Sequence, residues 1–177
     1  MASAPLISAV AAAGAMAMPG VVQVGDQVLA AASCGTRETL WIDHYVATLY
    51  VRPGDAPDHA LLDPRLAKAL EIRLLNKSFM PAEIPRKYRH ALEAALDADA
   101  MDRAREAYRA LRAGDVIRVA YAPGAGLAVS VNGQPILTSP THGVVGAILL
   151  TWADGKPLHQ HLRAVLAKHP CPAPVTG

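Results

Sequence analysis

The sequence predicts an α+β fold, in which several antiparallel strands form a sheet and a helical insertion packs against it. Three observations lead to this prediction. Short stretches rich in β-branched and aromatic residues recur in both halves of the chain. Between them, from Pro81 to Gly114, the apolar residues recur at helical spacing. The pair Asn132-Gly133 stands between two of the short stretches and favours a tight hairpin, and therefore antiparallel pairing.

Length and composition indicate one compact domain with tails. The chain has 177 residues, of which 52% are hydrophobic and 18% charged, which suits a buried core rather than a disordered chain. A net charge of +2 gives no reason to expect nucleic acid or an acidic membrane surface as a partner. The sequence contains no Cys-x-x-Cys motif and no Cys or His residues at the spacing of metal ligands, so we expect neither a metal site nor a cofactor. Cys34 and Cys171 leave the redox compartment open.

The first residues, 1–19, form an Ala-rich arm. Residues 6–18 are almost entirely small or apolar, and Ala15-Met16-Ala17 resembles a signal-peptide cleavage site, although no basic residue precedes Arg37. We therefore expect an exported, periplasmic protein; the alternative is a cytoplasmic protein with a disordered or docked arm. The apolar run is too short for a membrane-spanning helix, so no integral membrane segment is expected. The domain should cover 20–169, and the Pro-rich tail 170–177 should be disordered.

The first strands surround one central stretch. Residues 21–24 and 27–33 flank Gly25-Asp26 and should form a hairpin. Residues 40–51 should form a strand, with apolar residues on both parities and therefore with both faces covered. Pro53-Gly54 should end that strand.

The middle of the chain should turn from strand to helix. Residues 58–69 favour a short helix with a cap near Asp63-Pro64, and residues 70–75 favour a strand. From Pro81 two amphipathic helices follow, separated by an N-cap at Asp97-Ala-Asp99, and the second should end at Gly114. Their alternating charges indicate solvated helix faces.

The remainder of the chain should return to strands and finish in helices. Residues 116–122, 127–131 and 134–138 should be strands, the last two paired through the Asn-Gly turn. Residues 144–152 and 157–168 should close the domain as helices.

Several of these segments resemble the chalcone isomerase-like superfamily. Gly35-x-Arg37 followed by Tyr45-Val-Ala-x-Leu-Tyr50 is similar to its Gly-x-Arg and Val-Tyr-x-x-x-Leu-Tyr strand, with His44 where the family often has Val. Gly114-Asp115, Tyr121-x-Pro-Gly and Asn132-Gly133 follow in the family's order, and the resemblance covers roughly residues 21–168. It implies an open-faced β-sandwich: a large curved antiparallel sheet with helices packed on one face and a ligand cleft between them.

The same resemblance nominates site residues. Arg37 stands where the family's arginine contacts the anionic oxygen of a ligand, and an arginine fork is suited to a carboxylate or a developing oxyanion. Tyr45 lies near the tyrosine that helps hold a carboxylate in fatty-acid-binding relatives, where plant chalcone isomerases carry Thr. Trp41, Leu49 and Phe79 are candidates for walls of the cleft, and the alternative, which we favour for each, is an ordinary core residue. Arg37 and Tyr45 can meet only if the chain turns near residues 35–39.

Three functions from different classes follow, and the third is a structural or adaptor domain with a vestigial pocket. The first is binding of a fatty-acid-like or other carboxylate or phenolic small molecule. The alternative is a cofactor-free isomerase, an intramolecular lyase that closes a chalcone-type enone to a flavanone with Arg37 as its catalytic residue. The lysine, tyrosine and asparagine of the plant enzymes have no clear counterpart between Lys77 and Tyr88, which weighs against efficient cyclisation. The oligomeric state is left open.

Overall fold

A computed structural model describes residues 19–78 and 80–140 of the chain. The predicted Ala-rich arm up to residue 18, the expected helices 144–152 and 157–168, and the tail lie outside the described residues. Within the described ranges, no helix is long and apolar enough to cross a membrane.

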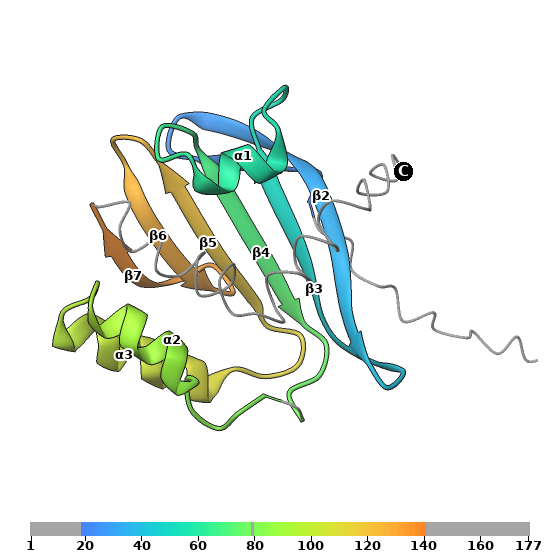
Figure 1. The fold of residues 1–177 in the computed structure, drawn as a ribbon, viewed down its shortest axis with the longest axis vertical. Coiled ribbons are helices and arrows are strands. Elements are labelled where there is room, and N and C mark those ends of the chain that lie inside the picture. The colour runs from blue at the N-terminus through green and yellow to red at the C-terminus, as the bar shows by residue number, and fades with distance from the viewer. Residues whose placement is uncertain (1–18, 79, 141–177) are drawn as a thin grey trace, which may run out of the picture.

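Seven strands form one antiparallel sheet in sequential order, from β1 to β7. Each strand pairs with the next along the chain, so the sheet is a curled meander (Figure 1). The strands are β1 (Val21–Val24), β2 (Gln27–Thr39), β3 (Ile42–Val51), β4 (Lys68–Leu74), β5 (Val116–Ala122), β6 (Gly126–Val131) and β7 (Gln134–Ser139). The α+β prediction and the open-faced architecture, with helices on one face of a large sheet, are confirmed.

The central hairpin differs from the prediction. The chain turns at Leu40 and Trp41, and not within residues 35–39. Both turn residues have positive φ, 51° and 67°, although neither is a residue type that signals such a turn. The strand expected at 40–51 therefore begins at Ile42, and the preceding residues extend β2 to Thr39.

Three helices accompany the sheet: α1 (Pro57–Leu62), α2 (Arg86–Glu93) and α3 (Ala98–Ala110). The helical region expected from Pro81 begins only after Pro85, whose extended backbone serves as the N-cap of α2. The predicted N-cap of α3 is confirmed, because the Asp97 carboxylate accepts a hydrogen bond from Ala100 N at 2.7 Å. This helix ends at Ala110, before Gly114, which instead adopts φ 94° in the turn leading into β5.

The two faces of the sheet bury different side chains. On the face that carries α3, the core contains Leu49, Leu70, Ile72, Leu127 and Leu137, and α3 packs against it. The opposite face has a smaller apolar cluster around Leu29 and Ala69. The prediction that both faces are covered is correct for the second half of β3, Ala47–Val51, whereas the first half is only partly buried and Asp43 is exposed.

The second face also holds a buried carboxylate. Glu71 is 1% exposed, pairs with Arg118 and accepts a hydrogen bond from the Tyr50 hydroxyl at 3.0 Å. Burial and the neighbouring carboxylate both raise the pKa of Tyr50, so this hydroxyl stays protonated and remains a donor. The charge of Glu71 is thus compensated on the side of the sheet away from the helices.

Candidate functional site

A cavity of about 320 Å³ lies between the sheet and the helices. Its floor comes from the α3-bearing face of β3 to β7, and its other wall from α3 and from residues 80–96, here called the roof segment. Most lining residues are apolar: Ile72, Leu74, Met80, Pro81, Ile84, Pro85, Leu92, Ala104, Ala107, Leu111, Ile117, Val119, Val129, Val131, Ile136 and Leu137. Such a lining with a few convergent polar groups is typical of small-molecule sites.

The polar lining residues gather at one end of the cavity. His44 and Tyr45 begin β3, and Asn76 follows the end of the neighbouring strand β4, where its backbone N–H donates to His44 O at 3.1 Å. Tyr108 lies in the last turn of α3, and the chain that leaves this helix returns to β4 through a hydrogen bond from Gly114 N to Leu74 O at 2.7 Å. Elements distant in sequence thus bring four polar residues to one end of the cavity.

The orientation of Asn76 is fixed by its neighbour. Its Oδ1 accepts a hydrogen bond from Ser78 N at 2.8 Å. Because a backbone N–H can only donate, the side-chain atom facing it must be the oxygen. The group that Asn76 can offer to the cavity is therefore its amide N–H₂, a hydrogen-bond donor.

The other end of the cavity is apolar. Val129 on β6 pairs with Leu137 on β7, and Ile136 and Ala104 lie beside them in the lining. Arg103 on α3 donates to Ile136 O at 3.3 Å, which holds the helix over β7. From β3 to β7 the sheet crosses four strand spacings, about 19 Å. The cavity is thus polar beneath β3 and β4 and apolar beneath β6 and β7.

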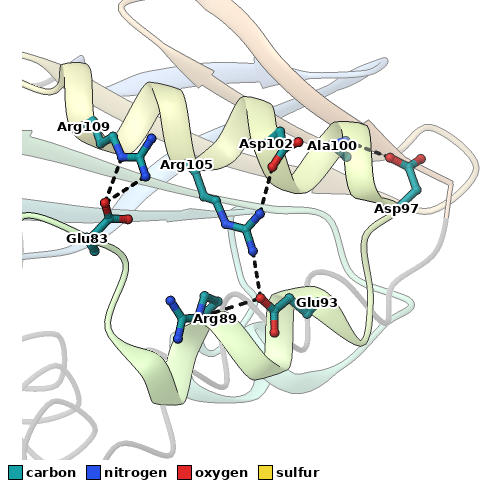
Figure 2. Close-up of polar contacts among 8 residues, drawn as sticks. All are labelled: Glu83, Arg89, Glu93, Asp97, Ala100, Asp102, Arg105 and Arg109. Carbon is teal, nitrogen blue, oxygen red and sulfur yellow. Dashed lines mark hydrogen bonds and ion pairs between the residues drawn. The ribbon is translucent and has the colours of Figure 1, made fainter.

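Ion pairs on the outer surface attach the roof segment to α3 (Figure 2). Glu83 accepts from Arg109 at 2.8 Å, and Arg105 bridges Glu93 and Asp102, also at 2.8 Å to each. These pairs are exposed or half-buried, so each contributes at most about 1 kcal/mol. Burial of Ile84, which is 8% exposed, adds an apolar contact beneath them.

The observed register brings together the two principal residues nominated from the sequence. Arg37 on β2 pairs directly with Tyr45 on β3. Directly opposed residues of an antiparallel pair share one face of the sheet, with Cβ atoms about 4.5–5.5 Å apart. Tyr45 lines the cavity, and position 37 lies next to it on the neighbouring strand.

The suggested wall residues lie elsewhere. Trp41 is 93% exposed at the tip of the β2–β3 hairpin and does not line the cavity, contrary to our expectation for a wall of the cleft. Its displacement follows from the position of the turn, which takes residues 40 and 41 out of the strand. Leu49 is fully buried in the hydrophobic core and does not line the cavity, and Phe79 lies outside the described residues.

Sequence reasoning did not select His44, Asn76 or Tyr108. Tyr108 is one of the residues at helical spacing between Pro81 and Gly114 and could have been nominated as a polar group facing the sheet. Asn76 and His44 carry no local signal, because their common position depends on the pairing of β3 with β4. Among the described residues, no group of three His, Cys, Asp or Glu side chains could hold a metal ion.

Comparisons with known proteins found a matching family and a similar solved structure. A family model described as chalcone isomerase-like matches residues 10–166. Among solved structures, a crystal structure of a fatty-acid binding protein from Arabidopsis thaliana is similar, with 14% sequence identity and a TM-score of 0.49 over 83% of this chain and 89% of that chain. No curated protein matches the sequence.

Proposed function

Because the chain belongs to the chalcone isomerase-like family, we propose that its cavity binds one small amphipathic molecule, a fatty acid or a similar carboxylate. The observation that carries this proposal is the division of the cavity into a polar and an apolar end. An amphiphile matches both ends only in one orientation, with its head group beneath β3 and β4 and its tail toward β6 and β7.

The head group is assigned to Arg37 and Tyr45. A guanidinium presents two parallel N–H donors with the spacing of a carboxylate, and a tyrosine hydroxyl adds a third donor. The pairing of the two positions across β2 and β3 supports this assignment. Asn76, which follows the end of β4, contributes a further donor.

The tail is held by apolar burial. Each methylene removed from water contributes about 0.8 kcal/mol. Ala104 on α3 and the lining residues of β6 and β7 offer this contact without a competing polar side chain, so we expect affinity to rise with chain length until the apolar end is filled. The carboxylate then determines orientation, and the tail determines most of the affinity.

The experiment measures by calorimetry how tightly single variants of Arg37 and Tyr45 bind two ligands, dodecanoate and dodecanol. Arg37→Ala should weaken dodecanoate binding by about 1.5–3 kcal/mol, and Tyr45→Phe by about 0.5–1.5 kcal/mol. Dodecanol, which has the same tail and no charge, should bind wild type and Arg37→Ala with nearly equal affinity. Arg65→Ala is the matched control, because Arg65 is exposed and pairs with Asp63 near α1. Equal losses for both ligands, or no loss for dodecanoate, would remove Arg37 from the site.

A further inference from the structure

The tip of the β2–β3 hairpin exposes two large apolar side chains. Leu40 is 77% exposed and Trp41 is 93% exposed, so neither contributes much to the core. The hairpin extends to the lower right in Figure 1, on the side of the sheet where β4 leaves toward α2. Scattered single apolar residues are ordinary on a protein surface, whereas two adjacent ones at a projecting tip form a point of contact.

The backbone at this tip is unfavourable for these residues. Both have φ in the left-handed region, 51° and 67°, which costs about 1–2 kcal/mol for each residue with a side chain. The β6–β7 hairpin of the same chain has φ 51° and 79° at its two turn residues and uses Asn132 and Gly133, which suit that geometry. Leu and Trp therefore stand where the turn itself favours other residues.

Two carboxylates stand directly behind the tip. Glu38 and Asp43 are paired across the hairpin, one pair inward from Thr39 and Ile42, and both are exposed. Like charges placed opposite each other destabilise an antiparallel pair. A cation that approaches the tip would relieve this repulsion. The surface therefore combines two apolar side chains at the tip with two carboxylates behind them.

We propose that this tip docks on a zwitterionic lipid surface. Leu40 and Trp41 enter the boundary between head groups and acyl chains, where Trp is favoured. Glu38 and Asp43 then lie at the depth of the head groups, next to the outward ammonium groups of phosphatidylcholine or phosphatidylethanolamine. The charge complementarity selects this partner over an anionic membrane, which would repel both carboxylates.

The tip that docks on the lipid surface lies close to the polar end of the cavity. Tyr45 is four residues from Trp41 along β3, about 13 Å. The polar end of the cavity thus lies close to the docked surface, in reach of a molecule whose head group occupies that surface. Only this connection depends on the proposed ligand; the docking itself depends on the tip alone.

The test replaces the tip with turn residues. Wild type and Leu40→Asn/Trp41→Gly are sedimented with sucrose-loaded phosphatidylcholine vesicles. The variant should partition at least about tenfold more weakly, since burial of one large apolar side chain already exceeds this factor. Its melting temperature should rise by at least about 2 °C, because the turn strain is relieved. Val28→Asn, which removes a 61% exposed apolar residue from β2, is the matched control and should bind vesicles like wild type.

A second variant keeps the test informative if the new turn alters folding. Glu38→Lys/Asp43→Lys retains the apolar tip and should shift the preference from phosphatidylcholine to phosphatidylglycerol vesicles. Unchanged partitioning of the tip variant would overturn the proposal. So would a wild-type dimer in sedimentation velocity that dissociates in the tip variant, since the tip would then contact a second copy. Dodecanoate affinity, measured in solution without vesicles, reports separately on the cavity.

Discussion

Filling the apolar part of the cavity should change stability and ligand affinity in opposite directions. Ala104 lies on α3, lines the cavity and packs against the core beneath it. In Ala104→Leu, three additional carbon atoms occupy space that the proposed ligand tail would use. We therefore expect a more stable protein that binds dodecanoate less well.

The magnitude follows from apolar burial. Three carbons at about 0.8 kcal/mol each raise the free energy of unfolding by about 2 kcal/mol. Displacement of an equal length of tail removes about the same free energy from binding, or a factor of about 30–50 in Kd. Ala110→Leu is the control, because Ala110 is exposed in the last turn of the same helix and should change neither quantity by more than about 0.5 kcal/mol.

Urea unfolding and calorimetry with dodecanoate measure the two effects. A fall in both stability and affinity would mean that the cavity cannot accept the larger side chain without rearrangement. Increased stability with unchanged affinity would place the ligand elsewhere, and the reasoning about the apolar end would be refuted.

Two further predictions concern other parts of the molecule. Burial lowers the pKa of Lys68 to about 8, so the unfolded chain holds this proton more tightly than the folded one between pH 8 and 10.5. The free energy of unfolding of wild type should consequently rise with pH across that window, by at most about 3 kcal/mol more than that of Lys68→Met. Urea unfolding at several pH values measures both proteins, and the same pH dependence for the two would contradict the prediction. For the alternative function, a single Arg37 without further positioned groups should give at most a slow cyclisation of a naringenin-type chalcone, with little stereoselectivity. Chiral analysis of the flavanone tests this, and a fast reaction to one enantiomer would favour an isomerase.

Local turn chemistry allowed much of the sheet to be predicted. Gly25-Asp26 and Asn132-Gly133 predicted two hairpins that the structure contains, although β2 continues to Thr39, beyond its expected end at residue 33. The central hairpin was misplaced because Leu40 and Trp41 carry no turn signal, although they adopt the same type of left-handed backbone. This single error concealed the direct pairing of Arg37 with Tyr45.

The cavity could be predicted only in part. Tyr45 was nominated through family resemblance and lines the cavity, whereas His44, Asn76 and Tyr108 come together through strand pairing and helix return, which no local pattern encodes. The role of Arg37 stays a prediction. The ion pairs of the roof segment could not be predicted from local patterns either, since they join residues up to 26 positions apart. Export of the protein remains a prediction, because residues 1–18 lie outside the described ranges.

The orientation of a bound amphiphile tests the central claim most directly. Nuclear Overhauser contacts from uniformly ¹³C-labelled dodecanoate would locate both ends of the ligand in one experiment. The account predicts contacts from the carbon next to the carboxylate to the Tyr45 ring, and from the terminal methyl to Val129 and Ile136. Contacts in the reverse order, or no contact with either end of the cavity at saturating dodecanoate, would contradict it.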